Sequence, residues 1–323
     1  MKKKTTFILM AFVMALFTLT SCSDDDNTVT VAPATNTIAD FVAANSDYSS
    51  LGAALDRAGL TSVLDGDTEY TVFAPNNTAF DTFLSDNGFA NLEAVPVDVL
   101  TQVLLNHVVN GTNTSGNLTT GYIETLAQEA TTGNTLNMYV NTADGVVLNG
   151  ISTVSTADVP VDNGVIHAVN SVIGLPTVVT FATADATFSS LVAALTRETS
   201  FTYVATLSTT GTPAPFTVFA PTNQAFTNLI GELEGVNDLA DIPTATLEAT
   251  LNTHVIAGAN VLASTLMDGM TVDNTLGADF TINTAGGASF TDLNGRMGDI
   301  VVTDVQAANG VIHVISEVIL PQL

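Results

Sequence analysis

Two short segments of this chain each occur twice at one spacing, and this repeat constrains the fold more than any other feature. Residues 71–80 read TVFAPNNTAF and residues 217–226 read TVFAPTNQAF, with eight of ten positions identical. Residues 163–173 read NGVIHAVNSVI and residues 309–319 read NGVIHVISEVI, with seven of eleven identical. Both pairs are offset by 146 residues, whereas the units of solenoids are about 20–50 residues long. The sequence therefore predicts a tandem pair of whole domains, each near the commonest domain size of ~100–150 residues.

The repeated segments resemble the two sequence motifs of fasciclin-type adhesion domains. In that family the first motif is a strand that reads roughly TVFAPTNxAF. The second, NGVIHxIxxVL, lies near the end of the domain. The resemblance covers about residues 37–176 and 177–321, so residues 37–176 and 177–323 are expected to be two fasciclin-like domains. It implies an α+β fold, in which each domain is a wedge-shaped, mainly antiparallel β-sandwich with several helices.

The motif residues that the resemblance carries over are interpreted as structural. They are Thr71, Phe73, Pro75, Phe80, His107, Asn163, Gly164 and His167 in the first domain, and Thr217, Phe219, Pro221, Phe226, His254, Asn309, Gly310 and His313 in the second. Animal members of the family often carry a Tyr-His dipeptide that is implicated in integrin binding. Here the dipeptides are Asn106-His107 and Thr253-His254, so integrin recognition is not carried over to this chain.

The order of patterns within each repeat supports the same fold class. A helical pattern runs through residues 41–60, with Ser46 or Asp47 as an expected N-cap and Gly59 as the expected stop. Asn76 or Asn77, and in the second repeat Thr222 or Asn223, are expected to cap the helix after the first motif. Strand patterns follow at residues 135–140, 146–148 and 165–172. Helices before strands predict an α+β domain, and the short connection at residues 174–177 predicts that the two domains touch.

Residues 1–21 have the pattern of a secretion signal. Three lysines precede an apolar stretch of thirteen residues, which is shorter than the ~20 residues that span a bilayer. The sequence LTSC that follows resembles a bacterial lipobox, in which the peptidase cleaves before the cysteine and the cysteine carries lipid. Cys22, the single cysteine of the chain, is therefore the expected lipidation site. A membrane partner is expected through this anchor.

Residues 22–36 are expected to form an acidic and polar tether. Residues 24–26 are three aspartates directly behind the cysteine. An acidic run at this position resembles the surface-export signal of Bacteroidota lipoproteins, which implies an outer-membrane lipoprotein displayed on the cell surface. A tether that merely holds the domains away from the membrane on the periplasmic side is the second interpretation.

The charge of the mature chain excludes nucleic acid as a partner. After removal of residues 1–21, three arginines remain against 32 acidic residues, a formal net charge of −29. Binding to a phosphate backbone needs clustered lysines and arginines, which this chain lacks. The chain also has no tryptophan, which weakens the case for a platform that stacks against sugar rings.

The histidines are the main candidates for chemistry. The chain has four, at equivalent positions in the two repeats, and Asp158 and Asp304 lie nine residues before His167 and His313. A His/His/Asp metal site in each repeat is one interpretation, but HExxH and HxH spacings are absent, and the apolar neighbours favour buried structural histidines. The acidic residues 65–69 suggest a calcium loop, although they lack the EF-hand pattern and a counterpart in the second repeat. No cofactor and no metal are therefore expected.

The expected function is that of a non-enzymatic cell-surface adhesion or extracellular-matrix-binding lipoprotein. Its ligand is an extracellular protein or glycan, and the sequence does not separate the two. The alternatives are a carbohydrate-binding accessory protein and an envelope polysaccharide hydrolase. No nucleophile elbow, phosphate loop or pair of catalytic carboxylates recurs at one place in both repeats, which favours binding over catalysis.

Overall fold

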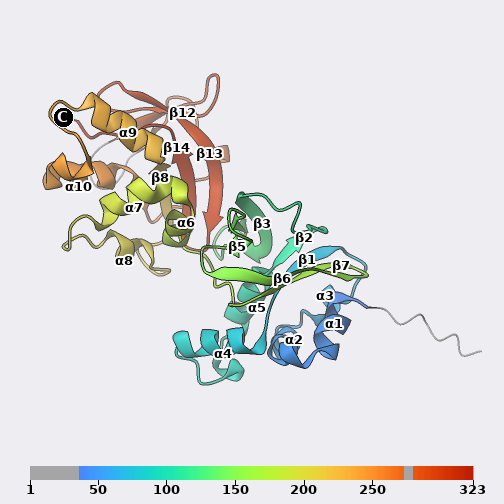
Figure 1. The fold of residues 1–323 in the computed structure, drawn as a ribbon. Coiled ribbons are helices and arrows are strands. Elements are labelled where there is room, and N and C mark those ends of the chain that lie inside the picture. The colour runs from blue at the N-terminus through green and yellow to red at the C-terminus, as the bar shows by residue number, and fades with distance from the viewer. Residues whose placement is uncertain (1–35, 273–278, 323) are drawn as a thin grey trace, which may run out of the picture. The chain divides into compact units, whose positions relative to one another are not determined.

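The computed structural model describes residues 36–272 and 279–322, which form two domains of similar architecture (Figure 1). In the first domain, helices α1, α2 and α4 gather on one side of the strands. The expected lipidation site Cys22 and the aspartates at 24–26 lie outside the described residues. Among the described residues no single helix is long and apolar enough to cross a membrane. One pair, Val178–Ala184 with Ala186–Thr196, meets that test only when joined across a bend of 94°.

The first domain consists of five helices, two short 3-10 turns and seven strands among its described residues. Its helices are α1 (Ile38–Ala44), α2 (Ser49–Ala58), α3 (Thr61–Leu64), α4 (Asn77–Asp86) and α5 (Val97–Leu105), with the 3-10 turns η1 (Ser46–Tyr48) and η2 (Leu92–Ala94). Its strands are β1 (Tyr70–Pro75), β2 (Val108–Asn110), β3 (Gly121–Gln128), β4 (Thr135–Asn141), β5 (Val147–Leu148), β6 (Ser152–Val161) and β7 (Gly164–Val169).

The second domain repeats this order. Its helices are α6 (Val178–Ala184), α7 (Ser189–Thr196), α8 (Tyr203–Leu207), α9 (Asn223–Glu232) and α10 (Thr244–Thr253), with the 3-10 turns η3 (Ala186–Phe188), η4 (Leu239–Asp241) and η5 (Ala263–Thr265). Its strands are β8 (Phe216–Pro221), β9 (Val255–Ala257), β10 (Thr271–Val272), β11 (Phe280–Asn283), β12 (Ser289–Thr291), β13 (Met297–Ala307) and β14 (Gly310–Ile315).

The described residues of each domain form one seven-stranded sheet, and the sheet is mainly antiparallel as predicted. The strand orders are β2-β1-β7-β6-β5-β4-β3 and β10-β11-β12-β13-β14-β8-β9. Each sheet also holds one parallel pair, β1 with β7 and β8 with β14. In the first domain β2 and β3, at opposite ends of the order, contact each other, so the sheet folds over towards a sandwich. The predicted α+β fold class is confirmed.

The two repeated motifs form the parallel pair of each sheet, which lies one strand in from the sheet edge. Phe73 lies beside His167 in the register of β1 and β7, and Phe219 lies beside His313 in that of β8 and β14. These four strands are buried along nearly their whole length. Strands buried on both faces need near-continuous apolar side chains, which explains why the motifs read as runs of Val, Ile, Phe and Ala.

The predicted helix boundaries agree with the structure at most positions. Asn76 caps α4 and Thr222 caps α9, each through a bond from the backbone amide three residues on. Gly59 ends α2 with φ 68°, in the left-handed region that glycine adopts at little cost. These three predictions are confirmed.

The predicted cap of α2 is wrong. Ser46 and Asp47 lie in the 3-10 turn η1, and neither side chain caps the helix. Instead, the amide of Ser50 in the first turn of α2 donates to the side-chain oxygen of Asn77, at 2.9 Å. The cap therefore comes from the beginning of α4, a segment distant in sequence, and the second domain repeats this with Asn223.

Polar groups of the two domains form hydrogen bonds with each other. The hydroxyl of Tyr122 donates to the carboxylate of Asp185 at 3.0 Å, and that of Tyr139 donates to the same carboxylate at 3.4 Å. The amide of Gln306 donates to the side-chain oxygen of Asn137 at 2.7 Å. The carboxylate of Asp185 thus accepts hydrogen bonds from both domains, since the amide and hydroxyl of Thr187 in its own domain donate to it as well.

Candidate binding site

The asparagine of the second motif fastens three segments of its domain together. The side-chain oxygen of Asn163 accepts a hydrogen bond from the amide of Ile38, at 2.9 Å. Its amide nitrogen donates to the carbonyls of Leu64 and Gly66, both at 2.8 Å. Asn309 makes the three equivalent bonds in the second domain. This residue therefore joins the first helix, the helix before the first motif and the start of the last strand.

The glycine that follows is required by a close approach of two strands. Gly164 has φ 142°, and a β-carbon placed on it would lie 1.9 Å from the carbonyl oxygen of Tyr70. Gly310 has φ 154°, and its β-carbon would lie 2.1 Å from the carbonyl oxygen of Phe216. No other residue fits either the dihedral angle or the space.

His107 joins the end of α5 to the segment that follows β7. The amide of Ile173 donates to Nε2 at 2.8 Å, so Nδ1 carries the proton and donates to the carbonyl of Val103 at 2.7 Å. Burial lowers the pKa of His107 to about 4, even though the bond to Val103 favours the charged ring. In the second domain His254 bonds to the equivalent groups, the carbonyl of Thr250 and the amide of Ile319, and burial lowers its pKa to about 4 as well. Both rings are neutral donors and acceptors rather than cations.

His167 and His313 are also fully bonded to backbone groups. In His167, Nε2 donates to the carbonyl of Asn113 at 2.9 Å, while the amide of Asp158 donates to Nδ1 at 3.2 Å. His313 makes the corresponding bonds, to Val261 and from Asp304. Within the described residues, no group of three or more His, Cys, Asp or Glu side chains converges as metal ligands do.

Ser115 is a residue that the sequence analysis missed, and with Asp158 and His167 it forms a set that resembles a catalytic triad. Its hydroxyl and its amide both donate to the carboxylate of Asp158. In a triad, however, the histidine accepts the serine proton, whereas here Nε2 donates to a backbone carbonyl and is unable to accept it. Asp158, with φ 60° in the bulge of β6, is held in place by this set. The equivalent bond in the second domain comes from the backbone of Ala263, so the arrangement does not need a hydroxyl.

The acidic residues 65–69 are bonded to separate neighbours. Asp65 accepts from the hydroxyl of Thr37 at 2.9 Å, and Glu69 accepts from the hydroxyl of Thr112 at 3.1 Å. These bonds draw the two carboxylates to different segments of the domain. They act as local hydrogen-bond acceptors in a solvated turn.

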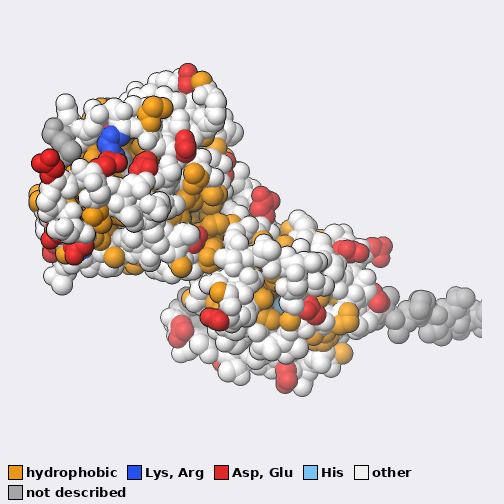
Figure 2. Space-filling model, turned by 45° about the horizontal axis from the view of Figure 1, so that its top comes forward, with side chains coloured by type: hydrophobic (Ala, Val, Ile, Leu, Met, Phe, Trp, Pro, Cys, Tyr) orange, Lys and Arg blue, Asp and Glu red, His pale blue; other side chains and the backbone are white. Residues whose placement is uncertain are grey.

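The three arginines of the chain are all bonded within their own domains. Arg57 donates to three backbone carbonyls of residues 92–95, and Arg197 donates to two carbonyls of the corresponding segment. Arg296 forms ion pairs with acidic side chains beside the C-terminal segment. The surface is correspondingly acidic: Figure 2 shows Asp and Glu side chains scattered over the visible face and very few basic ones.

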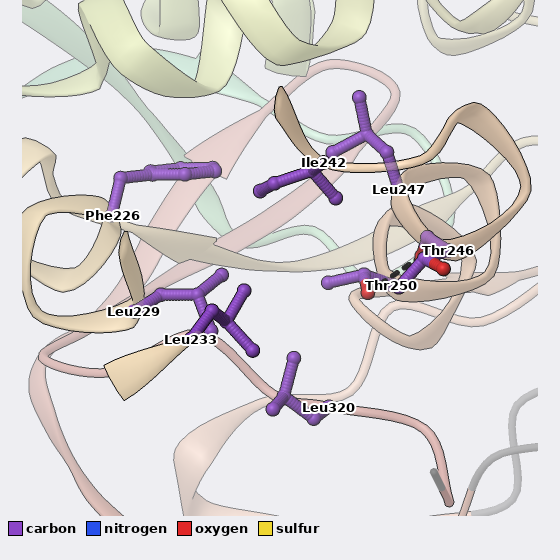
Figure 3. A pocket seen from close by; sticks show the side chains of 8 residues that line it. All are labelled: Phe226, Leu229, Leu233, Ile242, Thr246, Leu247, Thr250 and Leu320. Atoms are coloured by element: carbon purple, nitrogen blue, oxygen red, sulfur yellow. Dashed lines mark hydrogen bonds between the residues drawn. The ribbon is translucent and has the colours of Figure 1, made fainter. Parts of the chain in front are cut away.

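A small cavity lies between α9 and α10 of the second domain (Figure 3). Its volume is about 20 Å³, and its lining consists of Phe226, Leu229, Leu233, Ile242, Thr246, Leu247, Thr250 and Leu320. The hydroxyl of Thr250 donates to the carbonyl of Thr246 at 2.8 Å, so no free polar group faces the space from this residue. A gap of about one water volume with an apolar lining stays empty. It is a packing gap between the helices.

The corresponding place in the first domain is an open groove of about 1260 Å³. We call it the α4–α5 groove. Its lining includes Phe83 and Asn87 at the end of α4, Val99 and Val103 on α5, and Gly174 after the last strand. Thr210 and Ala308 of the second domain border it. Its size exceeds the ~300–1,000 Å³ of small-molecule pockets.

One buried carboxylate also lines the α4–α5 groove. Glu129 lies in the turn between β3 and β4 and is 4% exposed. Burial raises the pKa of Glu129, but hydrogen bonds from Thr131 and Thr132 outweigh burial and hold the pKa below its usual range. The groove therefore keeps a negative charge at this end.

The comparison with known proteins gives the family. The model of the fasciclin domain matches residues 46–176 and 186–321. This chain therefore belongs to the fasciclin family and carries two fasciclin domains, which confirms the resemblance of its motifs.

Relatives with curated descriptions and one solved structure give further comparisons. Protein sll1483 of Synechocystis sp. is 36% identical over 137 residues, which are 42% of this chain and 72% of that protein. Human periostin is 28% identical over 297 residues, 88% of this chain but only 31% of periostin. The FAS1 domain pair of the insect cell adhesion molecule Fasciclin I is 20% identical, covers 84% of this chain and 92% of that chain, and has a TM-score of 0.48.

The motif residues named from the sequence lie in the scaffold and not on a recognition surface. Fifteen of the sixteen are buried, and Gly164 is half-buried. Sequence reasoning missed the α4–α5 groove, because its residues come from segments that only the fold brings together. Comparing the two repeats position by position offers one signal: Asn87 and Gly174 stand where the second repeat has Leu233 and Leu320.

Proposed function

We propose that this chain is a non-enzymatic lipoprotein of the cell surface that mediates adhesion or binds extracellular matrix. Fasciclin domains are linked to cell adhesion and matrix binding in relatives of this chain. In this proposal Cys22 carries the lipid, residues 22–36 form the tether, and the outer membrane displays both domains towards the outside.

One observation carries the proposal: the features shared by the two repeats are used inside the domains. The repeated histidines bond to backbone groups through both ring nitrogens. The repeated Asn-Gly pair holds segments together. A reaction performed by both repeats would need a shared and accessible set of reactive groups. Because the shared residues are used for internal bonds, recognition through surfaces that differ between the domains explains them better than a reaction common to both repeats.

An attachment assay tests the proposal. Beads coated with residues 27–323 are mixed with cells that lack the protein, and beads with an unrelated acidic protein serve as the control. We expect saturable attachment that the soluble chain competes away. Envelope polysaccharide incubated with the chain is analysed by mass spectrometry for released sugars, and formation of a product would refute the adhesin and favour the hydrolase.

The kind of ligand is decided by two parallel binding measurements. A glycan array probes carbohydrate binding directly, and purified envelope proteins immobilised on a sensor probe protein binding. Binding confined to the array would favour the carbohydrate-binding accessory protein.

A further inference from the structure

We propose that the α4–α5 groove of the first domain is the recognition site of this chain, and that it binds a basic, amphipathic segment of a partner protein. This proposal rests on the adhesive function proposed above. It goes further by naming one domain, one site and the chemistry of the partner.

The groove exists because two side chains that close the second domain are replaced in the first. Five of the eight residues around the cavity of the second domain have counterparts in the groove: Leu229, Leu233, Thr246, Thr250 and Leu320 correspond to Phe83, Asn87, Val99, Val103 and Gly174. Leu233 and Leu320 point into the space between α9 and α10 (Figure 3). Their counterparts are a polar residue and a residue without a side chain. The first domain therefore lacks the two leucine side chains that fill the space between the helices in the second domain.

Apolar side chains that line the groove are also exposed to solvent. Val99 is 38% exposed and Ile151 is 56% exposed, and both line the groove. The counterpart of Val99 is Thr246, and the counterpart of Phe89, another lining residue, is Val236, because Gly88 and Gly235 correspond as the left-handed residues that follow the two helices. Large apolar side chains left half-exposed around one hollow are typical of a site that a partner covers. The second domain has a polar residue in place of Val99 and a smaller apolar residue in place of Phe89.

The charges at the groove determine the sign of the partner. Asp86 and Asp98 are exposed on its border, and Glu129 lies at one end. No lysine or arginine is among the lining residues described. A segment that carries lysine or arginine beside its apolar anchor therefore complements the groove. A second copy of this chain does not, because its mature part has no lysine and its three arginines are bonded internally.

The shape and lining of the groove favour a protein segment over a glycan. It lies between two helices, and an amphipathic helix laid into a hydrophobic groove is a recurring mode of recognition. The rings of Phe83 and Phe89 lie 6.5 Å apart and are tilted at 36° to each other. They provide an apolar surface for an aliphatic anchor, whereas flat stacking on sugar rings is served best by tryptophan, which the chain lacks.

The test uses a synthetic probe. It is an eighteen-residue peptide with leucines at helical spacing on one face and lysines on the other, labelled for fluorescence anisotropy with residues 27–323 of the chain. Matched peptides replace every lysine by glutamate, or every leucine by serine. We expect binding of the first peptide only, with an affinity that falls as salt is raised.

The chain itself suggests the variant that closes the groove. Asn87→Leu with Gly174→Leu copies the second domain, and a β-carbon on Gly174 meets no atom within 4 Å, so the variant is expected to fold. We expect at least tenfold weaker binding of the peptide. Asp86→Asn and Asp98→Asn should each weaken binding about two- to fivefold. Asp81→Asn, on the same helix but outside the groove, is the matched control and should change nothing.

The outcomes separate this proposal from the function on which it rests. Peptide binding that survives closure of the groove, or that is equal for the glutamate peptide, would overturn the proposed site. Loss of bead attachment in the closed variant supports it. Attachment that persists in the closed variant, with no peptide binding by the original chain, would sink the groove and leave the adhesive function standing. Specific peptide binding by a chain that never supports attachment would do the reverse.

Discussion

His107 and His254 contribute to stability as neutral rings, and this makes the stability depend on pH. Their pKa is lowered by burial to about 4 from an ordinary value of 6.5. Between these values the unfolded chain binds a proton that the folded chain does not. The contribution of each neutral ring to the free energy of unfolding is therefore complete above pH 6.5. It decreases as the pH falls towards 4, by about 1.4 kcal/mol per pH unit for each ring.

The variant His107→Gln tests this account, because glutamine can donate and accept hydrogen bonds but does not titrate. We expect urea unfolding of the first domain to lose about one proton of pH dependence between pH 6.5 and 4, relative to the original chain. His254→Gln should do the same for the second domain. An unchanged slope in both variants would show that the rings are not the groups that titrate.

Gly164 illustrates how one missing side chain allows two buried strands to pair closely. Gly164→Ala should destabilise the first domain by ~3 kcal/mol or more, because the new β-carbon would overlap the carbonyl oxygen of Tyr70 at a backbone angle that alanine avoids. Gly116→Ala is the control, since no atom lies within 4 Å of its β-carbon. Denaturant unfolding measures both, and equal stabilities would contradict the steric argument.

At the scale of elements, local signals were readable from the sequence and contacts between distant segments were not. The caps Asn76 and Thr222 and the stop at Gly59 follow from short-range chemistry, so the sequence predicts them correctly. The cap of α2 comes from Asn77 across the domain, and the sequence analysis placed it wrongly. The α4–α5 groove was missed for the same reason. Its walls are helices whose existence is predictable, but whether a cavity between them is filled depends on side chains that meet only in the folded domain.

Arg57 makes a second contact between distant elements that the hydrophobic periodicity of the sequence does not predict. It ties α2 to the segment before α5 through three backbone carbonyls. Arg57→Met keeps the apolar stem and removes these bonds, and should lower the stability of the first domain by ~1–3 kcal/mol. Arg197→Met should have the same effect on the second domain. A differential scan in which either variant shifts only its own domain would support this, and no shift would count against it.

At the scale of the whole molecule, the expected lipid anchor decides where the two domains work. Cys22→Ser should release the protein from membranes or leave its precursor uncleaved, because the serine hydroxyl cannot take the place of the thiol that carries the lipid. Incorporation of radiolabelled palmitate measures this. Failure of the original chain to incorporate the label would contradict the lipoprotein interpretation.

Display on the cell surface is a separate expectation and has its own measurement. Removal of residues 24–26 should leave the protein bound to membranes but protected from protease added to intact cells. The complete chain should be digested under the same conditions. Protection of both forms would place the domains on the periplasmic side.

The pairing of β1 with β7 also determines when a domain can begin to exist. The parallel pair joins residues 70–75 to residues 164–169, so nearly a whole domain must leave the ribosome before these two strands can pair. Contacts between such distant segments form slowly, because the loop between them must be ordered first. The first domain therefore stays unfolded until its second motif, residues 163–173, has emerged. It can then fold while the second domain is still being synthesised. Truncation of the carboxyl end into β14 would remove residues of the parallel pair of the second domain, whereas shortening the tether would remove none of the sheet.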